Sequence, residues 1–89
     1  MLKAWIEDAL SRSFVPRSLS VADESDRHAG HAGWREGGET HFRVEIVSEA
    51  FAGKSRIERH RLVNAALVGA FERGLHALAI TARAPGETG

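Results

Sequence analysis

Apolar residues recur at three- and four-residue spacing over the first ten positions of the chain, with charged residues between them. This spacing is typical of a helix with one buried stripe. Because proline lacks a backbone N–H and cannot continue a helix, we expect this one to end before Pro16. The predicted stripe consists of Leu2, Trp5, Ile6, Ala9 and Leu10.

Two later segments alternate apolar and polar residues, as a strand buried on one face does. The first is short, with Leu19 and Val21 on its apolar side, and the second runs from Phe42 to Ile46. We expect these two strands to form an antiparallel hairpin. The thirteen residues 26–38 between them include four glycines and show no periodicity. They predict a long loop, and loops of this length are often functional.

The second half of the chain predicts a helical turn, a helix and a last strand. Residues 49–53 are too few for a stable helix and end in a glycine. Ser55 and Glu58 then form a capping-box pattern, so the helix should begin near Arg56. It should end before Gly74, a residue type that favours the position after a helix. Its predicted stripe contains Ile57, Val63, Leu67, Ala70 and Phe71.

Residues 75–82 read as the last strand, and residues 83–89 as a flexible tail. The predicted order is therefore helix, strand, strand, helical turn, helix, strand. With the helices on one face of a three-stranded sheet, this order gives a two-layer α+β fold. At 89 residues we expect one domain over positions 1–89. The pattern leaves the order of the strands open.

Composition narrows the functional classes. Twelve basic residues balance twelve acidic ones, which argues against binding driven by bulk positive charge but allows a local patch. No stretch approaches the roughly 20 apolar residues of a membrane span, so we expect a soluble, cytoplasmic protein. There is no nucleophile elbow, metalloprotease motif or glycine-rich phosphate loop, and we therefore predict a protein that is not an enzyme.

Histidine is the candidate metal ligand, because the chain has five histidines and no cysteine. His28 and His31 lie three residues apart among glycines, so both imidazoles could approach one metal ion. The alternative is that they are exposed and inert. His76 is predicted on the strand face of Leu78 and Ile80, where a histidine is commonly a hydrogen-bonded residue at the edge of the core. His41 has the opposite parity to the apolar residues of its strand, which predicts a structural role at most.

A second candidate site is basic. Four fixed positive charges fall within eight residues at the predicted helix start, next to a glycine turn, an arrangement that suits phosphate. The alternative is a solvated helix face, with His60 packed against the sheet. The segment lacks the second glycine of the KH phosphate-clamping loop, which argues against RNA binding of that kind. The residues of this candidate partner or nucleic-acid surface are Lys54, Arg56, Arg59, His60 and Arg61.

Several separated segments together resemble the BolA family. They are Asp23-Glu24-Ser25 with His28, Glu39-Thr40-His41-Phe42, Phe51-Ala52-Gly53-Lys54-Ser55, Arg59-His60-Arg61 and Gly74-Leu75-His76-Ala77-Leu78. The resemblance covers nearly the whole chain and implies a class II KH-like αββααβ fold with a mixed sheet. One departure is that Pro85 and Glu87 are not followed by the tryptophan that often ends such chains.

The resemblance also implies a function. In BolA-like proteins the histidine matching His76, with a histidine or cysteine of the first hairpin loop, ligates a 2Fe-2S cluster in a heterodimer with a monothiol glutaredoxin. The glutaredoxin cysteine and a glutathione thiol supply the sulfur ligands, so this chain alone would lack the cluster. Either His28 or His31 fits the loop position. The leading hypothesis is thus a partner in iron-sulfur cluster trafficking or iron homeostasis, without a small-molecule substrate, and the alternative is a DNA-binding transcriptional regulator.

Overall fold

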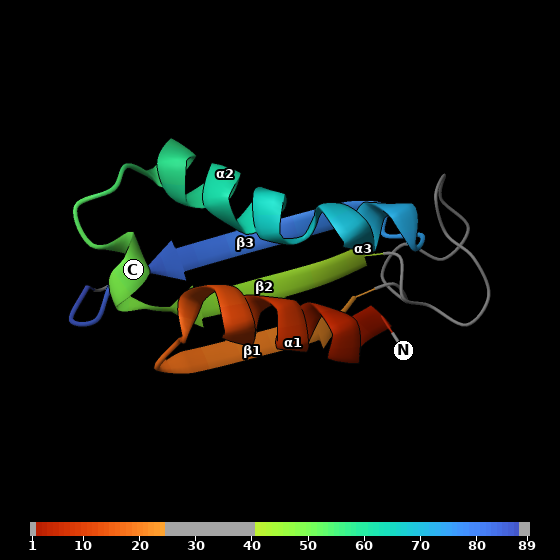
Figure 1. Ribbon diagram of the computed structural model, residues 1–89, viewed down its shortest axis with the longest axis horizontal. Coiled ribbons are helices and arrows are strands. Elements are labelled where there is room, and N and C mark those ends of the chain that lie inside the picture. The colour runs from red at the N-terminus through yellow and green to blue at the C-terminus, as the bar shows by residue number, and fades with distance from the viewer. Residues whose placement is uncertain (1, 25–40, 88–89) are drawn as a thin grey trace.

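A three-stranded mixed sheet forms one layer of the protein, and β2 is its central strand (Figure 1). The computed structural model describes residues 2–24 and 41–87. β1 (Ser18–Asp23) pairs antiparallel with β2 (His41–Val47), and β3 (Ala77–Arg83) pairs parallel with β2. The predicted antiparallel hairpin is confirmed. The predicted loop, residues 26–38, lies outside the described residues.

The helices lie over one face of this sheet (Figure 1). They are α1 (Leu2–Phe14), α2 (Arg56–Ala66) and α3 (Val68–Glu72), and the one-turn 3-10 helix η2 (Glu49–Phe51) follows β2. The predicted α+β order is thereby confirmed. Three residues of the predicted α1 stripe are buried, Leu2, Ile6 and Leu10, and the other two, Trp5 and Ala9, are half-buried. The alternating apolar residues of β2 are buried, while the charged residues between them are exposed. The largest fully buried side chains include Phe51, Ile6, Leu10, Ile46 and Leu67.

The predicted second helix is interrupted at Leu67, which separates α2 from α3 with φ −107° and ψ 13°. Leu67 itself is fully buried. The predicted stripe is wrong at Ile57 and Phe71, which are 64% and 42% exposed. At about 100° per residue, Ile57 is rotated about 120° away from the buried Val63, so one helix cannot bury both against the same sheet.

Local backbone signals fixed the helix ends. The Ser55–Glu58 capping box is present: Glu58 N–H donates to Ser55 Oγ at 3.1 Å, and Ser55 N–H donates to Glu58 Oε1 at 2.7 Å. These contacts with Ser55 lower the pKa of the Glu58 carboxyl. After α3, Gly74 has φ 106°, and Leu75 N–H donates to Ala70 O at 3.0 Å. Leu75 therefore belongs to the helix cap, and the strand begins two residues later than predicted.

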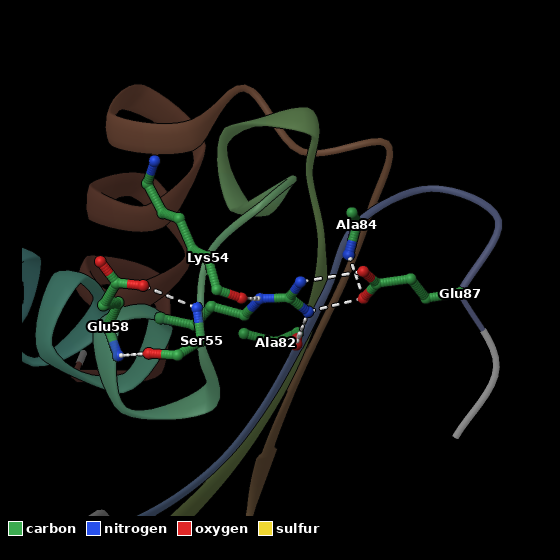
Figure 2. A network of polar contacts seen from close by, with 7 residues as sticks. Lys54, Ser55, Glu58, Ala82, Ala84 and Glu87 are labelled. Carbon is green, nitrogen blue, oxygen red and sulfur yellow. Dashed lines mark hydrogen bonds and ion pairs between the residues drawn. The ribbon is translucent and has the colours of Figure 1, made fainter.

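The last described residues form a turn that Arg59 fixes to the body of the protein (Figure 2). The Arg59 guanidinium donates to both carboxylate oxygens of Glu87, at 2.6 and 2.8 Å, and to the carbonyls of Lys54 and Ala82 at 3.0 and 3.1 Å. Ala84 N–H also donates to Glu87 at 2.9 Å. Residues 83–87 thus differ from the frayed tail that was expected, because this carboxylate closes the turn.

Val15, which follows α1, has an unusual backbone conformation. Its φ is +44°, and its side chain is 82% exposed. A side chain with a Cβ is disfavoured in this left-handed region, and a β-branched one especially so. The exposed valine makes little contact that would offset this cost.

Replacing Val15 with glycine should raise the free energy of unfolding by about 0.5–1 kcal/mol, since the left-handed penalty of about 1–2 kcal/mol exceeds the entropy that glycine loses on folding. Urea denaturation measures this. Ala4→Gly, at an exposed position of α1, is the matched control and should lower stability by about 1 kcal/mol. Equal destabilisation by both changes would contradict a strained Val15.

Removing the charge of Glu87 should change the pH dependence of stability. Hydrogen bonds from Arg59, and then from Ala84 N–H, lower the pKa of Glu87 from 4.5 to about 2. A lowered pKa in the folded state gives stability that is present above pH 4.5 and is lost as the pH falls toward about 2. The wild type should therefore be more stable than Glu87→Gln at neutral pH, and this difference should shrink across that window.

Denaturation midpoints measured from neutral to acidic pH provide the test. In an Arg59→Gln background, Glu87→Gln should have a much smaller effect, because the principal donor is already gone. A difference between wild type and Glu87→Gln that stayed constant down to pH 2 would show that the ion pair is not the cause.

Candidate functional site

Two histidines meet where β2 and β3 begin. Because these strands are parallel, their first residues lie at the same end of the sheet, with His41 opposite Ala77. The rings of His41 and His76 stack with centroids 6.1 Å apart and an angle of 20° between their planes. His41 is buried at 8% exposure, whereas His76 is exposed. In this pair the His76 imidazole is therefore open to solvent, and the buried His41 ring lies beneath it.

His76 precedes β3, so the alternation of the strand does not govern it. The sequence placed it on the face of Leu78 and Ile80, which are half-buried. Instead, His76 is exposed and lies next to His41. His41 belongs to the set of alternate positions in β2 that does not face the core. The sequence assigned His41 only a structural role and missed this pairing, because the register of two parallel strands leaves no local signal.

The attachment points of the long loop lie at the same end of the sheet. Glu24, the last residue described before the loop, donates its N–H to His41 O at 2.8 Å. Its carboxylate also accepts from Arg43 Nε at 3.1 Å. His28 and His31, the two candidate loop ligands, lie outside the described residues. Within residues 2–24 and 41–87, no three side chains of His, Cys, Asp or Glu are grouped as a metal site.

The basic candidate surface lies at the other end of β3. Lys54 and Arg56 are exposed at the start of α2, His60 is half-buried, and Arg61 is exposed. Arg59 differs from the rest, because its side chain is only 12% exposed and its guanidinium is bonded to Glu87. That bond also raises the pKa of Arg59. Within this candidate surface, Arg59 is therefore less available to a partner than Lys54, Arg56 and Arg61 are.

Four of these residues line a groove of about 530 Å³ between the start of α2 and the last half of β3. Lys54, Arg56, Arg59 and His60 form one side, residues 80–83 the other, and Glu87 closes the end. Arg61 is not among the lining residues. Arg83 and Glu87 were not predicted to belong to this surface, because residues 83–89 were expected to form a flexible tail.

The part of the chain that the structure describes contains no helix long and apolar enough to cross a membrane.

The comparisons with known proteins agree with one another. The family model "BolA-like protein" matches residues 10–87. A protein of Sinorhizobium sp., known only by its position in the 5′ region of cobS, is 51% identical over 87 residues, which are 97% of this chain and 94% of the relative. The "DNA-binding transcriptional regulator BolA" of Vibrio cholerae is 45% identical over 80 residues, 90% of this chain and 72% of that protein.

The solved structure of BolA1 from Arabidopsis thaliana superposes with a TM-score of 0.87 at 35% identity, covering all of this chain and 98% of that one. Several other curated relatives are longer, and the chain spans 23% to 61% of their length. The superposition confirms the class II KH-like fold that the resemblance implied. The family model matches most of the chain, and the sequence identities to these relatives are high. This chain therefore belongs to the BolA family.

Proposed function

We propose that this chain is a non-enzymatic binding module that pairs with a monothiol glutaredoxin to coordinate a shared 2Fe-2S cluster, in cluster trafficking or iron homeostasis. The observation that carries the proposal is the exposed His76 imidazole, stacked on the buried His41 ring at the end of the sheet where the loop with His28 and His31 is attached.

The donor chemistry fits such a cluster. An imidazole can replace a thiolate on one iron of a 2Fe-2S centre, as it does in Rieske centres. The His76 ring is exposed, with its centroid 6.1 Å from that of the buried His41 ring. When bound, the cluster supplies redox and transfer chemistry; what this chain supplies is imidazole ligands at the edge of a rigid sheet.

The chain cannot provide a full ligand set of the usual kind. It has no cysteine, so any thiolates must come from a partner, in this proposal a glutaredoxin cysteine and glutathione. Imidazole binds a metal only in its neutral form, so ligation through His76 should weaken in acid. A heterodimer that shares the cluster satisfies both requirements.

A second candidate function is DNA binding. The Vibrio cholerae relative carries that function in its name. Lys54, just before α2, is exposed, as are Arg56 and Arg61 in the first part of that helix. In this candidate the three cations contact the phosphate backbone, which fixes a protein on DNA without reading its sequence. Arg59 is not expected to contribute directly, because Glu87 already occupies its guanidinium.

The cluster proposal predicts a change in the visible circular dichroism of a cluster-loaded monothiol glutaredoxin when this protein is added. The spectrum should change up to a one-to-one ratio with the wild type and should stay unchanged with His76→Ala. Whichever of His28→Ala and His31→Ala also abolishes the change identifies the loop ligand.

The control is Arg12→Gln, which changes an exposed arginine of α1 that pairs with Asp8 and should behave like the wild type. Far-ultraviolet spectra of each variant exclude unfolding as the cause. If His76→Ala perturbs the cluster as the wild type does, His76 is not a ligand and the proposal in this form is wrong.

The DNA candidate predicts a steep dependence of affinity on salt. For duplex DNA, log K falls as log salt concentration rises, and this negative slope should become less steep by about 0.9 for each phosphate contact removed. Fluorescence anisotropy with Arg56→Gln and Arg61→Gln measures this. The control is Arg12→Gln, an exposed arginine of α1 whose side chain pairs with Asp8. If the slope is the same in all four proteins, α2 does not carry a DNA-binding surface.

A further inference from the structure

The groove between α2 and β3 is lined by several positive charges that no acidic side chain among the described residues balances. Arg59 is neutralised by Glu87 through two hydrogen bonds. Lys54, Arg56 and Arg83 also line the groove, and none of them forms an ion pair within the described residues. The lining is therefore cationic by about three charges, in a protein whose formal net charge is zero.

One donor in this lining has no acceptor. Arg83 Nε is buried, and among the described residues it has no hydrogen-bond partner. Leaving a buried donor unsatisfied is costly, more so when the group is charged. An acceptor oxygen brought by a ligand would remove that cost. The planar guanidinium of arginine suits phosphate oxygens because it offers parallel donors in a fixed geometry.

The rest of the groove is suited to an organic group. Ile80 and Ala82 both line the groove, and both are partly buried apolar residues packed against the core. His60 lines it from α2 and offers the flat ring of an imidazole. The volume of about 530 Å³ is in the range of small-molecule sites, about 300–1,000 Å³.

We propose that this groove binds a phosphate monoester of nucleotide size. The phosphate group is held by the cations of Lys54, Arg56 and Arg83, with Arg83 Nε donating to one phosphate oxygen. The organic group lies against Ile80, Ala82 and His60. The site is separate from the His76 end of the sheet, and it uses residues of β3 and the C-terminal turn that the DNA candidate does not.

The test is a two-dimensional amide NMR titration of the full chain with adenosine 5′-monophosphate, repeated with inorganic phosphate and with adenosine. We expect saturable shifts centred on residues 54–60 and 80–87 with the nucleotide. Phosphate alone should bind more weakly at the same residues, and adenosine should bind more weakly than the nucleotide because it lacks the charge.

Arg83→Gln should weaken binding of the nucleotide at least about tenfold, the effect of losing one hydrogen bond to a charged group. Arg83→Lys keeps the charge but lacks Nε, so its affinity should lie between those of Arg83→Gln and the wild type. Arg56→Gln, at an exposed position that folding does not require, should also weaken binding. Arg12→Gln on α1 is the control and should bind as the wild type does.

Four results would overturn the proposal. The first is that the nucleotide causes no saturable shifts, and the second is that adenosine and its monophosphate bind with equal affinity. The third is that Arg83→Gln and Arg56→Gln both bind the nucleotide as the wild type does. The fourth is that duplex DNA shifts these residues whereas the nucleotide does not. Because each variant's amide spectrum also reports its fold, loss of binding through unfolding is recognised in the same experiment.

Discussion

The parallel pairing of β2 with β3 is the constraint on which the rest of the structure depends. It brings the start of both strands to one end of the sheet, so His41 and His76 can stack although 35 positions of sequence separate them. It also brings the end of β3 beside the turn that leads into α2. Ser48 N–H donates to Arg83 O at 2.9 Å there, which continues the ladder past the last residue of β2. Both candidate sites are consequences of this one pairing.

Parallel neighbours require a long connection, and here α2 and α3 provide it. The connection has to cover the sheet and return to its other end. Leu67, which separates the two helices, is fully buried within this connection. Gly69 in α3 allows close packing on α1, because a Cβ at that position would lie 2.9 Å from the Trp5 ring. Arg73 covers the same ring from 4.6 Å.

What could be predicted from the sequence was local. The stripe of α1, the alternation in β2, the capping box at Ser55 and the glycine after α3 all act between residues a few positions apart, and each was recognised. The errors arose where distant residues decide. Arg59 looked like a surface cation because its partner, Glu87, is 28 positions away. His41 looked isolated because nothing in its own strand indicates where β3 will align.

The length of β3 sets the distance between the His76 end of the sheet and the far end of the groove. The strand has seven residues and rises about 3.3 Å per residue, so the first and last of them are about 20 Å apart. A partner at the His76 end and an occupant of the groove would therefore both contact this strand, whose residues 80–83 line the groove. Should one occupant alter the affinity for the other, the effect must be reciprocal. The hydrogen-bonded strand that joins the two ends would then be part of the path between them.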